Sequence, residues 1–208
     1  MKRLAILGAS GHGKVVADAA AAAGWDETVF YDDAWPRRRT NGPWAVVGDT
    51  AVLVDQLDEH DGVIVGIGDN RTRLDLAHRL TKSNARLVSV IHPQAVVSRY
   101  AEIGDGTVVF AGVVVNVDSR VGRGCIINTG ATVDHDCALA DGVHLSPGAH
   151  LAGGVTVGEA SWVGIGASVR QRVTVDRDVT VGAGAVVVSH VPAGQTVVGV
   201  PAKPLAAE

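Results

Sequence analysis

The spacing of hydrophobic positions changes once along the chain, near residue 91. Before that point, short aliphatic runs alternate with stretches in which apolar residues follow a helical spacing. Alternating strands and helices are typical of a parallel sheet covered by helices. The pattern predicts strands over residues 4–7, 28–31, 46–48, 63–68 and 86–91, and helices over residues 14–23 and 70–82.

From residue 91 the hydrophobic period is six. An aliphatic residue stands at every sixth position from Ile91 to Val187, and a small or β-branched residue at every sixth position from Ala95 to Val191. Neither an amphipathic helix nor a hairpin sheet keeps this period, whereas a solenoid does. Three hexads would form one triangular coil, in which equivalent strands stack at about 4.8 Å. We therefore expect an α/β domain over residues 1–90 and a β-helix over residues 91–208.

Composition excludes some classes of function. Of the 208 residues, 47% are hydrophobic and only 4% are aromatic, so the core must be aliphatic. The net charge is −4 and no basic stripe is visible, which argues against nucleic acid as a partner. The densest basic run, Arg37 to Arg39, is interpreted as a solvated loop.

Cysteine usage and the lack of long apolar runs indicate a cytoplasmic protein. Cys125 and Cys137 fall on small interior positions of the repeat, where they are predicted to be core residues and not a disulfide or metal site. The first residues do not form a secretory signal, and no apolar stretch reaches membrane-spanning length. We expect reduced thiols and no membrane insertion.

Four features of the chain resemble one known family. The repeat resembles the left-handed β-helix of hexapeptide acyltransferases, and the segment from Val198 to Lys203 resembles their closing loop. With the Gly8–Gly13 segment and the run from Asn128 to Cys137, the chain resembles the PglD/NeuD-type sugar acyltransferases. The resemblance implies a small Rossmann-like domain followed by a left-handed parallel β-helix. The left hand comes from the resemblance alone, since parallel crossovers generally favour the right.

The resemblance also implies the partners and the reaction. Members are homotrimers that bind acetyl-CoA in grooves between neighbouring β-helices. The members of most similar layout acetylate the amino group of a nucleotide-linked amino sugar, and others acetylate a hydroxyl of sialic acid or a related sugar. On this basis Pro201, Ala202 and Lys203 are expected to contact acetyl-CoA.

His135 is the predicted general base. It lies two residues after an interior valine, at a turn where its side chain projects outward, and histidine is the usual base near neutral pH. Asp136 is expected to hold the tautomer of the ring, with Asp134 as a competing candidate. Similar proteins often carry glutamate at the position of Asp136, so the reach of the shorter aspartate is an open point.

Three further residues are placed around this base. Gly153 would stack one coil from His135, where its backbone N–H could face a thioester oxygen or simply serve a tight turn. His144 should lie on the side of the coil opposite the His135 corner, so we expect it to act on the CoA side of a neighbouring subunit. Asn128 could hydrogen-bond the sugar, His135 or another asparagine in a ladder.

A zinc site formed by His135, His144 and His150 is the alternative for this histidine-rich stretch. Some β-helix proteins of this shape are zinc carbonic anhydrases. The histidine spacings here do not resemble the pattern of that family, so no metal is expected.

The first domain carries a candidate nucleotide site. Gly8, Gly11 and Gly13 form a bare loop between a strand and a helix, which suits a phosphate, and His12 could contact a diphosphate or the sugar. The glycine order is not that of the dinucleotide fingerprint, and the domain is too short for two mononucleotide halves. A nucleotide-linked sugar therefore fits better than a dinucleotide. Further candidate contacts are Asp32 and Asp33, which follow the second predicted strand, and Gly68 and Asn70, which lie at the end of the fourth.

Together these features predict an acetyl-CoA-dependent N-acetyltransferase acting on a nucleotide-linked amino sugar. O-acetylation of a sialic acid-like sugar is the first alternative. A non-catalytic trimeric scaffold or binding module is the second.

Overall fold

The computed structural model describes residues 1–205. The chain divides into two compact units, Met1–Pro93 and Gln94–Glu208. Each unit is described separately below.

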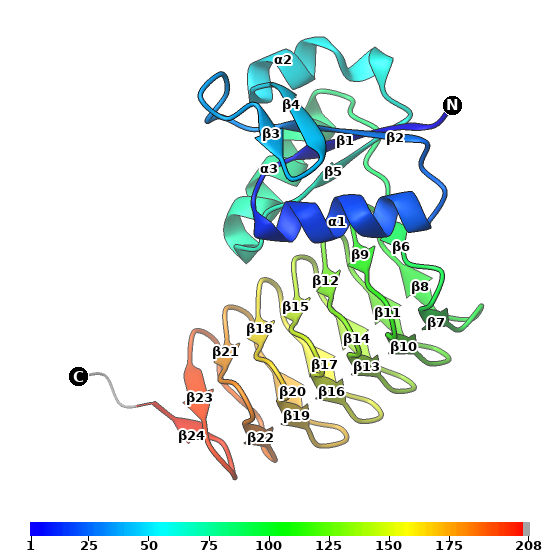
Figure 1. Ribbon diagram of the computed structural model, residues 1–208. Helices are drawn as coiled ribbons and strands as arrows, with labels where there is room; N and C mark the ends of the chain where they lie inside the picture. The colour runs from blue at the N-terminus through cyan, green and yellow to red at the C-terminus, as the bar shows by residue number, and fades with distance from the viewer. Residues whose placement is uncertain (206–208) are drawn as a thin grey trace. The chain divides into compact units, whose positions relative to one another are not determined.

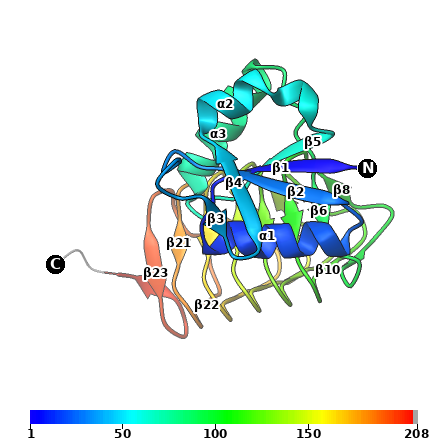
Figure 2. The same ribbon diagram turned by 45° about the horizontal axis from the view of Figure 1, so that its top comes forward.

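The first unit is a mostly parallel sheet with helices on both faces (Figure 2). Its strand order is β3-β4-β2-β1-β5, and only the β3–β4 pair is antiparallel. The elements are β1 (Arg3–Leu7), α1 (Gly11–Ala22), β2 (Glu27–Tyr31), β3 (Thr40–Asn41), β4 (Trp44–Gly48), α2 (Thr50–Asp55), the short 3-10 helix Leu57–Glu59, β5 (Gly62–Val65), α3 (Asn70–Lys82) and β6 (Val90–Ile91).

Alternation along the strands explains the two layers of core. Ala5, Leu7 and Tyr31 belong to one buried cluster with Leu53 of α2 and Leu80 of α3. The residues between them in β1 and β2, such as Ile6 and Phe30, point to the opposite face and are also fully buried. A Cβ on Gly13 of α1 would touch the Phe30 ring, which places α1 on that second face.

Two predicted strands of this unit are corrected. The predicted strand over residues 63–68 ends at Val65, and the glycines that follow form a loop. Instead of a strand over residues 86–91, only Leu87 pairs with the sheet, through a bridge to Val63, before β6 begins. Val90 is fully buried nonetheless, so the apolar pattern of this segment reflects burial without a continuous ladder.

The second unit is the parallel β-helix that the repeat predicts, with the left hand that the family resemblance implies (Figure 1). Two-residue strands alternate with turns, and each strand pairs with the strand one coil later, as Val115 does with Val133. We call the three sheets faces 1, 2 and 3. Face 1 holds β7 (Val96–Val97), β10 (Val114–Val115), β13 (Thr132–Val133), β16 (His150–Leu151), β19 (Ser168–Val169) and β22 (Val186–Val187).

Faces 2 and 3 complete each coil. Face 2 holds β8 (Glu102–Ile103), β11 (Arg120–Val121), β14 (Ala138–Leu139), β17 (Thr156–Val157) and β20 (Thr174–Val175). Face 3 includes β9 (Val108–Val109), β12 (Ile126–Ile127), β15 (His144–Leu145), β18 (Trp162–Val163), β21 (Thr180–Val181), β23 (Thr196–Val198) and β24 (Lys203–Pro204), the last pairing antiparallel with β23.

The interior of the β-helix consists of the two sixfold series. Nearly all of their members from Val109 onward form one buried cluster, and Val97, Ala101 and Ile103 pack against it half-buried. Polar members of the small series bond to backbone, as where Ser119 donates to the Asp134 carbonyl at 2.6 Å. Cys125 and Cys137 are buried free thiols in the same series. Because this interior is already complete, the outward residues of the turns can vary without loss of the fold.

Candidate functional site

His135 and Asp136 form a hydrogen-bonded pair in the turn between β13 and β14. His135 Nδ1 lies 2.7 Å from Asp136 Oδ2, and both side chains are more than half exposed. Asp136 has a φ of 59°, a left-handed conformation that aspartate tolerates better than most residues and that other coils often give to glycine. The shorter acid therefore does reach the ring. Since Nδ1 faces a carboxylate, it carries the proton in the neutral ring, and Nε2 is left with its lone pair.

The acids around His135 favour its protonated form. The pKa of His135 is raised by the hydrogen bond to Asp136 and then by the charge of Asp134, while Arg172 opposes them. Asp134 does not bond the ring. Its Oδ1 accepts instead from the backbone N–H of His135 at 2.8 Å and from Asn116 Nδ2 at 3.1 Å. Of the two candidate acids, Asp136 therefore orients the ring and Asp134 orders the turn.

Gly153 lies against the His135 ring. A Cβ at this position would be 2.6 Å from both Cε1 and Nε2 of His135, so only glycine leaves room for the imidazole in this position. The next residue, Gly154, donates its N–H to the His135 carbonyl at 2.9 Å. Within residues 1–205 the N–H of Gly153 has no hydrogen-bond partner. A glycine whose backbone donor is unpaired among the described residues thus lies against the ring that can accept a proton.

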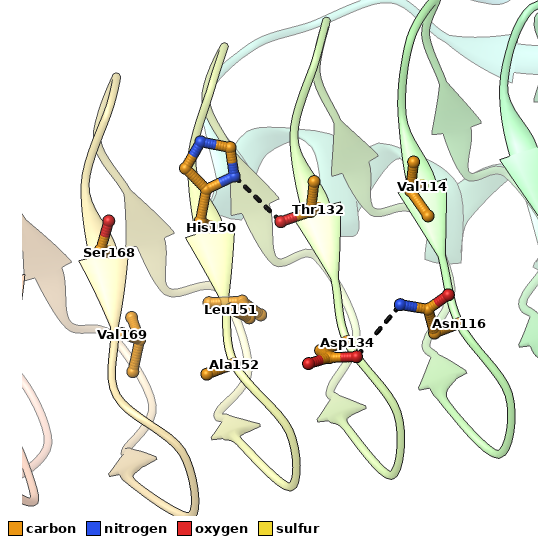
Figure 3. Close-up of a pocket in the computed structure, with 9 residues that line it drawn as sticks. All are labelled: Val114, Asn116, Thr132, Asp134, His150, Leu151, Ala152, Ser168 and Val169. Atoms are coloured by element: carbon orange, nitrogen blue, oxygen red, sulfur yellow. Dashed lines mark hydrogen bonds between the residues drawn. The ribbon is translucent and has the colours of Figure 1, made fainter.

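A cavity of about 420 Å³ lies on face 1, beside the strand that precedes this pair in the chain (Figure 3). Asp134 lines the cavity and precedes His135 in the chain, which connects the two features. Polar contacts across the face are Asn116 with Asp134 and Thr132 Oγ1 with His150 Nδ1 at 2.9 Å. Leu151, Ala152 and Val169 supply apolar lining, so the cavity combines apolar surface with a few polar groups.

His144 lies on face 3, away from the turn that holds His135. Its ring stacks on Trp162 of the next coil, with centroids 5.6 Å apart and planes 9° apart. Trp162 donates its indole N–H to Ser146 at 2.6 Å. Asn128 Nδ2 lies 3.4 Å from His144 Nε2, so within the chain the amide of Asn128 is next to His144 and not next to His135. Sequence reasoning missed Trp162 and Ser146, although the 18-residue stacking of Trp162 on His144 could have revealed the first.

The closing segment borders a second cavity. Ala202 donates its backbone N–H to the Val186 carbonyl at 2.8 Å, and the peptide bond before Pro201 is cis. Ala202 and Pro204 line a cavity of about 250 Å³ together with His190. Lys203 begins β24 and is exposed.

In the first unit, the Gly8–Gly13 loop lies where the sheet reverses its strand order. β1 pairs with β2 on one side and with β5 on the other, so the loops after β1 and β5 are neighbours at the carboxyl ends of the strands. Open parallel sheets bind ligands at such a point. Ser10 donates its hydroxyl to the Gly66 carbonyl at 3.3 Å, which joins the two loops.

The three helices of this unit begin differently. Asp49 caps α2 by accepting from the Val52 N–H, and Asp69 caps α3 by accepting from the Thr72 N–H. The N-cap of α1 is Ser10, which makes no side-chain cap among the described residues because its hydroxyl points to Gly66. Ser10 therefore does not supply the side-chain acceptor that Asp49 and Asp69 give to α2 and α3, and an anion could take that place.

The glycines of the loop fall into two groups. Added Cβ atoms would lie 2.6 Å from Ile67 at Gly8 and 2.3 Å from the Gly8 carbonyl oxygen at Gly13, so these two glycines permit tight packing. At Gly11 and Gly68 a Cβ would meet no described atom within 4 Å. Gly11 and Gly68 therefore border open space, where a ligand could approach the backbone.

Asp32 and Asp33 hold the surrounding loops. Asp32 accepts from the Ala9 N–H at 2.7 Å and the Ala34 N–H at 2.9 Å. Asp33 accepts from both the hydroxyl and the N–H of Thr50, and these bonds lower its pKa. Either acid would meet a ligand with a carboxylate already oriented by the protein.

His12 and Asn70 lie beside the buried Arg73. Burial, and then the charge of Arg73, lower the pKa of His12 to about 4, so its imidazole is neutral at neutral pH. Arg73 donates to the Asn70 side chain at 2.9 Å and to the Gly68 carbonyl at 2.9 Å. His12 can therefore offer a ligand hydrogen bonds but no positive charge.

Residues 1–205 provide neither a cluster of metal ligands nor a membrane-spanning helix. Residues 1–205 contain no group of three or more histidine, cysteine or acidic side chains arranged to hold a metal ion. His144 lies on face 3 and His150 on face 1, so the two do not converge within one chain. None of the helices described is long and apolar enough to cross a membrane.

Comparison with known proteins gives consistent matches. The family model for the PglD N-terminal domain matches residues 3–80. The UDP-N-acetylbacillosamine N-acetyltransferase of Bacillus subtilis (strain 168) is 38% identical over 118 residues, which are 53% of this chain and 52% of that protein. The match thus spans about half the length of this curated relative.

Solved structures match over the whole chain. The acetyltransferase domain of PglB from Neisseria gonorrhoeae FA1090, in complex with acetyl coenzyme A, superposes with a TM-score of 0.94 and 47% identity, covering 98% of this chain and 99% of that chain. PerB from Caulobacter crescentus, in complex with CoA and GDP-perosamine, superposes with a TM-score of 0.94 and 41% identity, covering 99% of this chain and 98% of that chain.

Proposed function

The chain belongs to the PglD-type family of sugar N-acetyltransferases, and from this premise we propose that it transfers the acetyl group of acetyl-CoA to the amino group of a nucleotide-linked amino sugar. The observation that carries the proposal is the contact of 2.7 Å between His135 Nδ1 and Asp136 Oδ2, with the ring lying against Gly153. This arrangement supplies an oriented base beside a free backbone donor.

The reaction uses these groups in order. A sugar amine is protonated near neutral pH, so it first releases one proton to solvent, and the neutral amine then loses a second proton as it attacks the thioester carbonyl. Nε2 of His135 accepts that proton, and Asp136 stabilises the resulting imidazolium. The carbonyl oxygen becomes an oxyanion, for which the Gly153 N–H is the candidate donor. The intermediate then collapses to the amide, and the departing CoA thiolate takes up the proton from His135.

The first unit would hold the nucleotide. The loops after β1 and β5 combine a helix start that the Ser10 side chain does not cap with open approach at Gly11 and Gly68, which suits the diphosphate of a nucleotide sugar. Asp32, Asp33, His12 and Asn70 border the same loops and could contact the nucleotide or the sugar. The homologous PerB structure contains GDP-perosamine, and the curated relative is named for a UDP-linked sugar.

The β-helix would bind acetyl-CoA between subunits of a homotrimer. His144 lies on a different face from His135, so it would serve the active site of a neighbouring subunit, with Asn128 and Trp162 fixing its ring. Ala202 and Lys203, with Pro201, would contact the cofactor at the far end of the coil stack. Such an enzyme would act in the cytoplasm, where acetyl-CoA and nucleotide sugars are available, and its product would enter glycan synthesis.

The test is a product assay with acetyl-CoA and paired acceptors. UDP-, GDP- and dTDP-linked sugars with either an amino or a hydroxyl group at the same carbon would be incubated with the protein, and the products identified by mass spectrometry. N-acetylation of an amino sugar, lost in His135→Ala, is expected. Acetylation of hydroxyl acceptors only would assign the O-acetyl reaction instead. The absence of product from every acceptor would favour a scaffold.

A further inference from the structure

Arg38 is the member of the basic run that the fold places at the Gly8–Gly13 loop. Its Nη1 donates to the Ala9 carbonyl at 2.6 Å and lies 3.3 Å from Asp32 Oδ2. Interpretation as a solvated loop is therefore incomplete for this residue. Its side chain remains 45% exposed, so the guanidinium is held by the loop without being buried.

The contacts of Arg38 leave donors available. Nη1 makes both bonds to the protein, and within residues 1–205 the remaining guanidinium N–H groups have no partner. Asp32 is engaged in turn, because its two oxygens accept from the Ala9 and Ala34 N–H groups as well as from Arg38. The carboxylate is therefore a support that fixes the loop and the guanidinium together.

Two basic side chains beside the nucleotide loop, His12 and Arg73, offer a ligand no accessible positive charge. The proposed ligand carries a diphosphate, whereas the imidazole of His12 is neutral at neutral pH and Arg73 is buried against Gly68 and Asn70. Arginine binds phosphate oxygens with pairs of parallel N–H groups, which Arg38 still has available. Arg38 is also anchored to Ala9, next to the N-cap of the helix that lacks a side-chain cap.

We propose that Arg38 binds the diphosphate of the nucleotide-linked sugar, with Asp32 as its positioning partner. This inference rests on the proposed function and adds to it a residue that determines nucleotide affinity. It separates Arg38 from Arg37, which belongs to the same run but has no hydrogen-bond or ion-pair partner within residues 1–205.

The test compares free nucleotides with free nucleosides. Inhibition constants for UDP, GDP, uridine and guanosine would be measured for the full-length wild type, Arg38→Met, Arg38→Lys and the matched control Arg37→Met. Arg38→Met should weaken binding of the preferred nucleoside diphosphate about tenfold or more and leave the nucleoside unchanged. Arg38→Lys should recover part of the loss, and Arg37→Met should match the wild type. The KM for acetyl-CoA should not change.

Three results would overturn the inference. Unchanged diphosphate affinity in Arg38→Met would remove Arg38 from the site while leaving the proposed function intact. An equal loss for diphosphate and nucleoside would mean that Arg38 only maintains the loop or contacts the base. A wild-type protein that binds neither nucleoside diphosphate and acetylates no nucleotide sugar would refute the proposed function itself.

Discussion

The His135 turn and the Gly8–Gly13 loop both depend on glycine, but for different reasons. Gly153, in the coil that follows the His135 turn, has no Cβ, and the exposed imidazole of His135 occupies that space. In the loop, Gly8 and Gly13 lack a Cβ where buried strand, helix and loop atoms pack together, while Gly11 borders open space. Substitutions at the His135 turn should therefore lower activity without lowering stability. In the loop, a substitution at Gly8 or Gly13 should lower stability, whereas one at Gly11 should affect ligand binding.

The largest effect is expected from His135→Ala. Loss of the base should lower kcat about 100- to 10,000-fold, with little change in either KM. The side chain is exposed in a turn outside the core cluster, so the Tm should stay close to that of the wild type. Steady-state kinetics and a thermal melt measure both quantities. Comparable turnover by the variant would remove His135 from the chemistry.

Gly153→Ala should come next. The new Cβ would displace the ring of His135 from its place, and a misplacement of this size can cost about 100-fold in kcat. Gly158→Ala is the control, because its Cβ would meet the backbone N of Arg177 at 2.3 Å. We expect the first variant to fold normally with low activity, and the second to lose stability in a denaturant titration. Loss of stability in Gly153→Ala together with normal stability in Gly158→Ala would contradict the role assigned to Gly153.

Asp136→Asn should move the acidic limb of the pH profile. Because Asp136 raises the pKa of His135, the wild-type ring becomes protonated, and inactive as a base, at a higher pH than an ordinary histidine. The variant should retain activity to a lower pH, while its plateau falls about tenfold because the ring is a weaker and less oriented base. A profile of kcat/KM against pH gives both values. If the acidic limb of the pH profile does not shift, the hydrogen bond between Asp136 and His135 does not control the titration that limits activity.

The smallest effects are expected in the loop, from the pair Gly11→Ala and Gly13→Ala. Gly13→Ala should destabilise the first unit by about 1–3 kcal/mol, because its Cβ collides with the Gly8 carbonyl. Gly11→Ala should leave stability unchanged or raise it by up to about 1 kcal/mol, since alanine favours a helix. It should nevertheless raise the KM for the nucleotide sugar several-fold, because the added methyl group would occupy space through which the ligand reaches the start of α1. Denaturant unfolding measures the stability of the two variants, and steady-state kinetics with the nucleotide sugar measures the KM. Equal losses of stability in Gly11→Ala and Gly13→Ala would contradict the different roles assigned to the two glycines.

The two units also differ in how far sequence alone could describe them. In the β-helix, the sixfold series from Ile91 to Val187 predicts both coil and interior, because each coil repeats the same packing problem. Outward residues such as His135 and Asp136 then stand out at turns. The sequence could not show whether the side chains of His135 and Asp136 are in contact, because the contact depends on the left-handed backbone of Asp136 and on the shape of one turn.

In the first unit, sequence reasoning located the main strands and helices but not their contacts. Helix α2 and strand β3 were missed, since each is short and lacks a clear period. The separation of Gly11 from Gly8 and Gly13 depends on tertiary packing that a glycine motif does not reveal. Arg38 could not be told from Arg37 for the same reason, because their difference lies in a bond to Ala9 from a distant loop.

We propose above that one chain joins a nucleotide-sugar site to a histidine base for acetyl transfer. The most direct measurement is the product formed from acetyl-CoA and a nucleotide-linked amino sugar by the wild type and by His135→Ala in parallel. We predict that the wild type forms an N-acetylated nucleotide sugar and an equal amount of free CoA, and that the variant forms at least about 100-fold less of each. Equal amounts of product from the two proteins would contradict it.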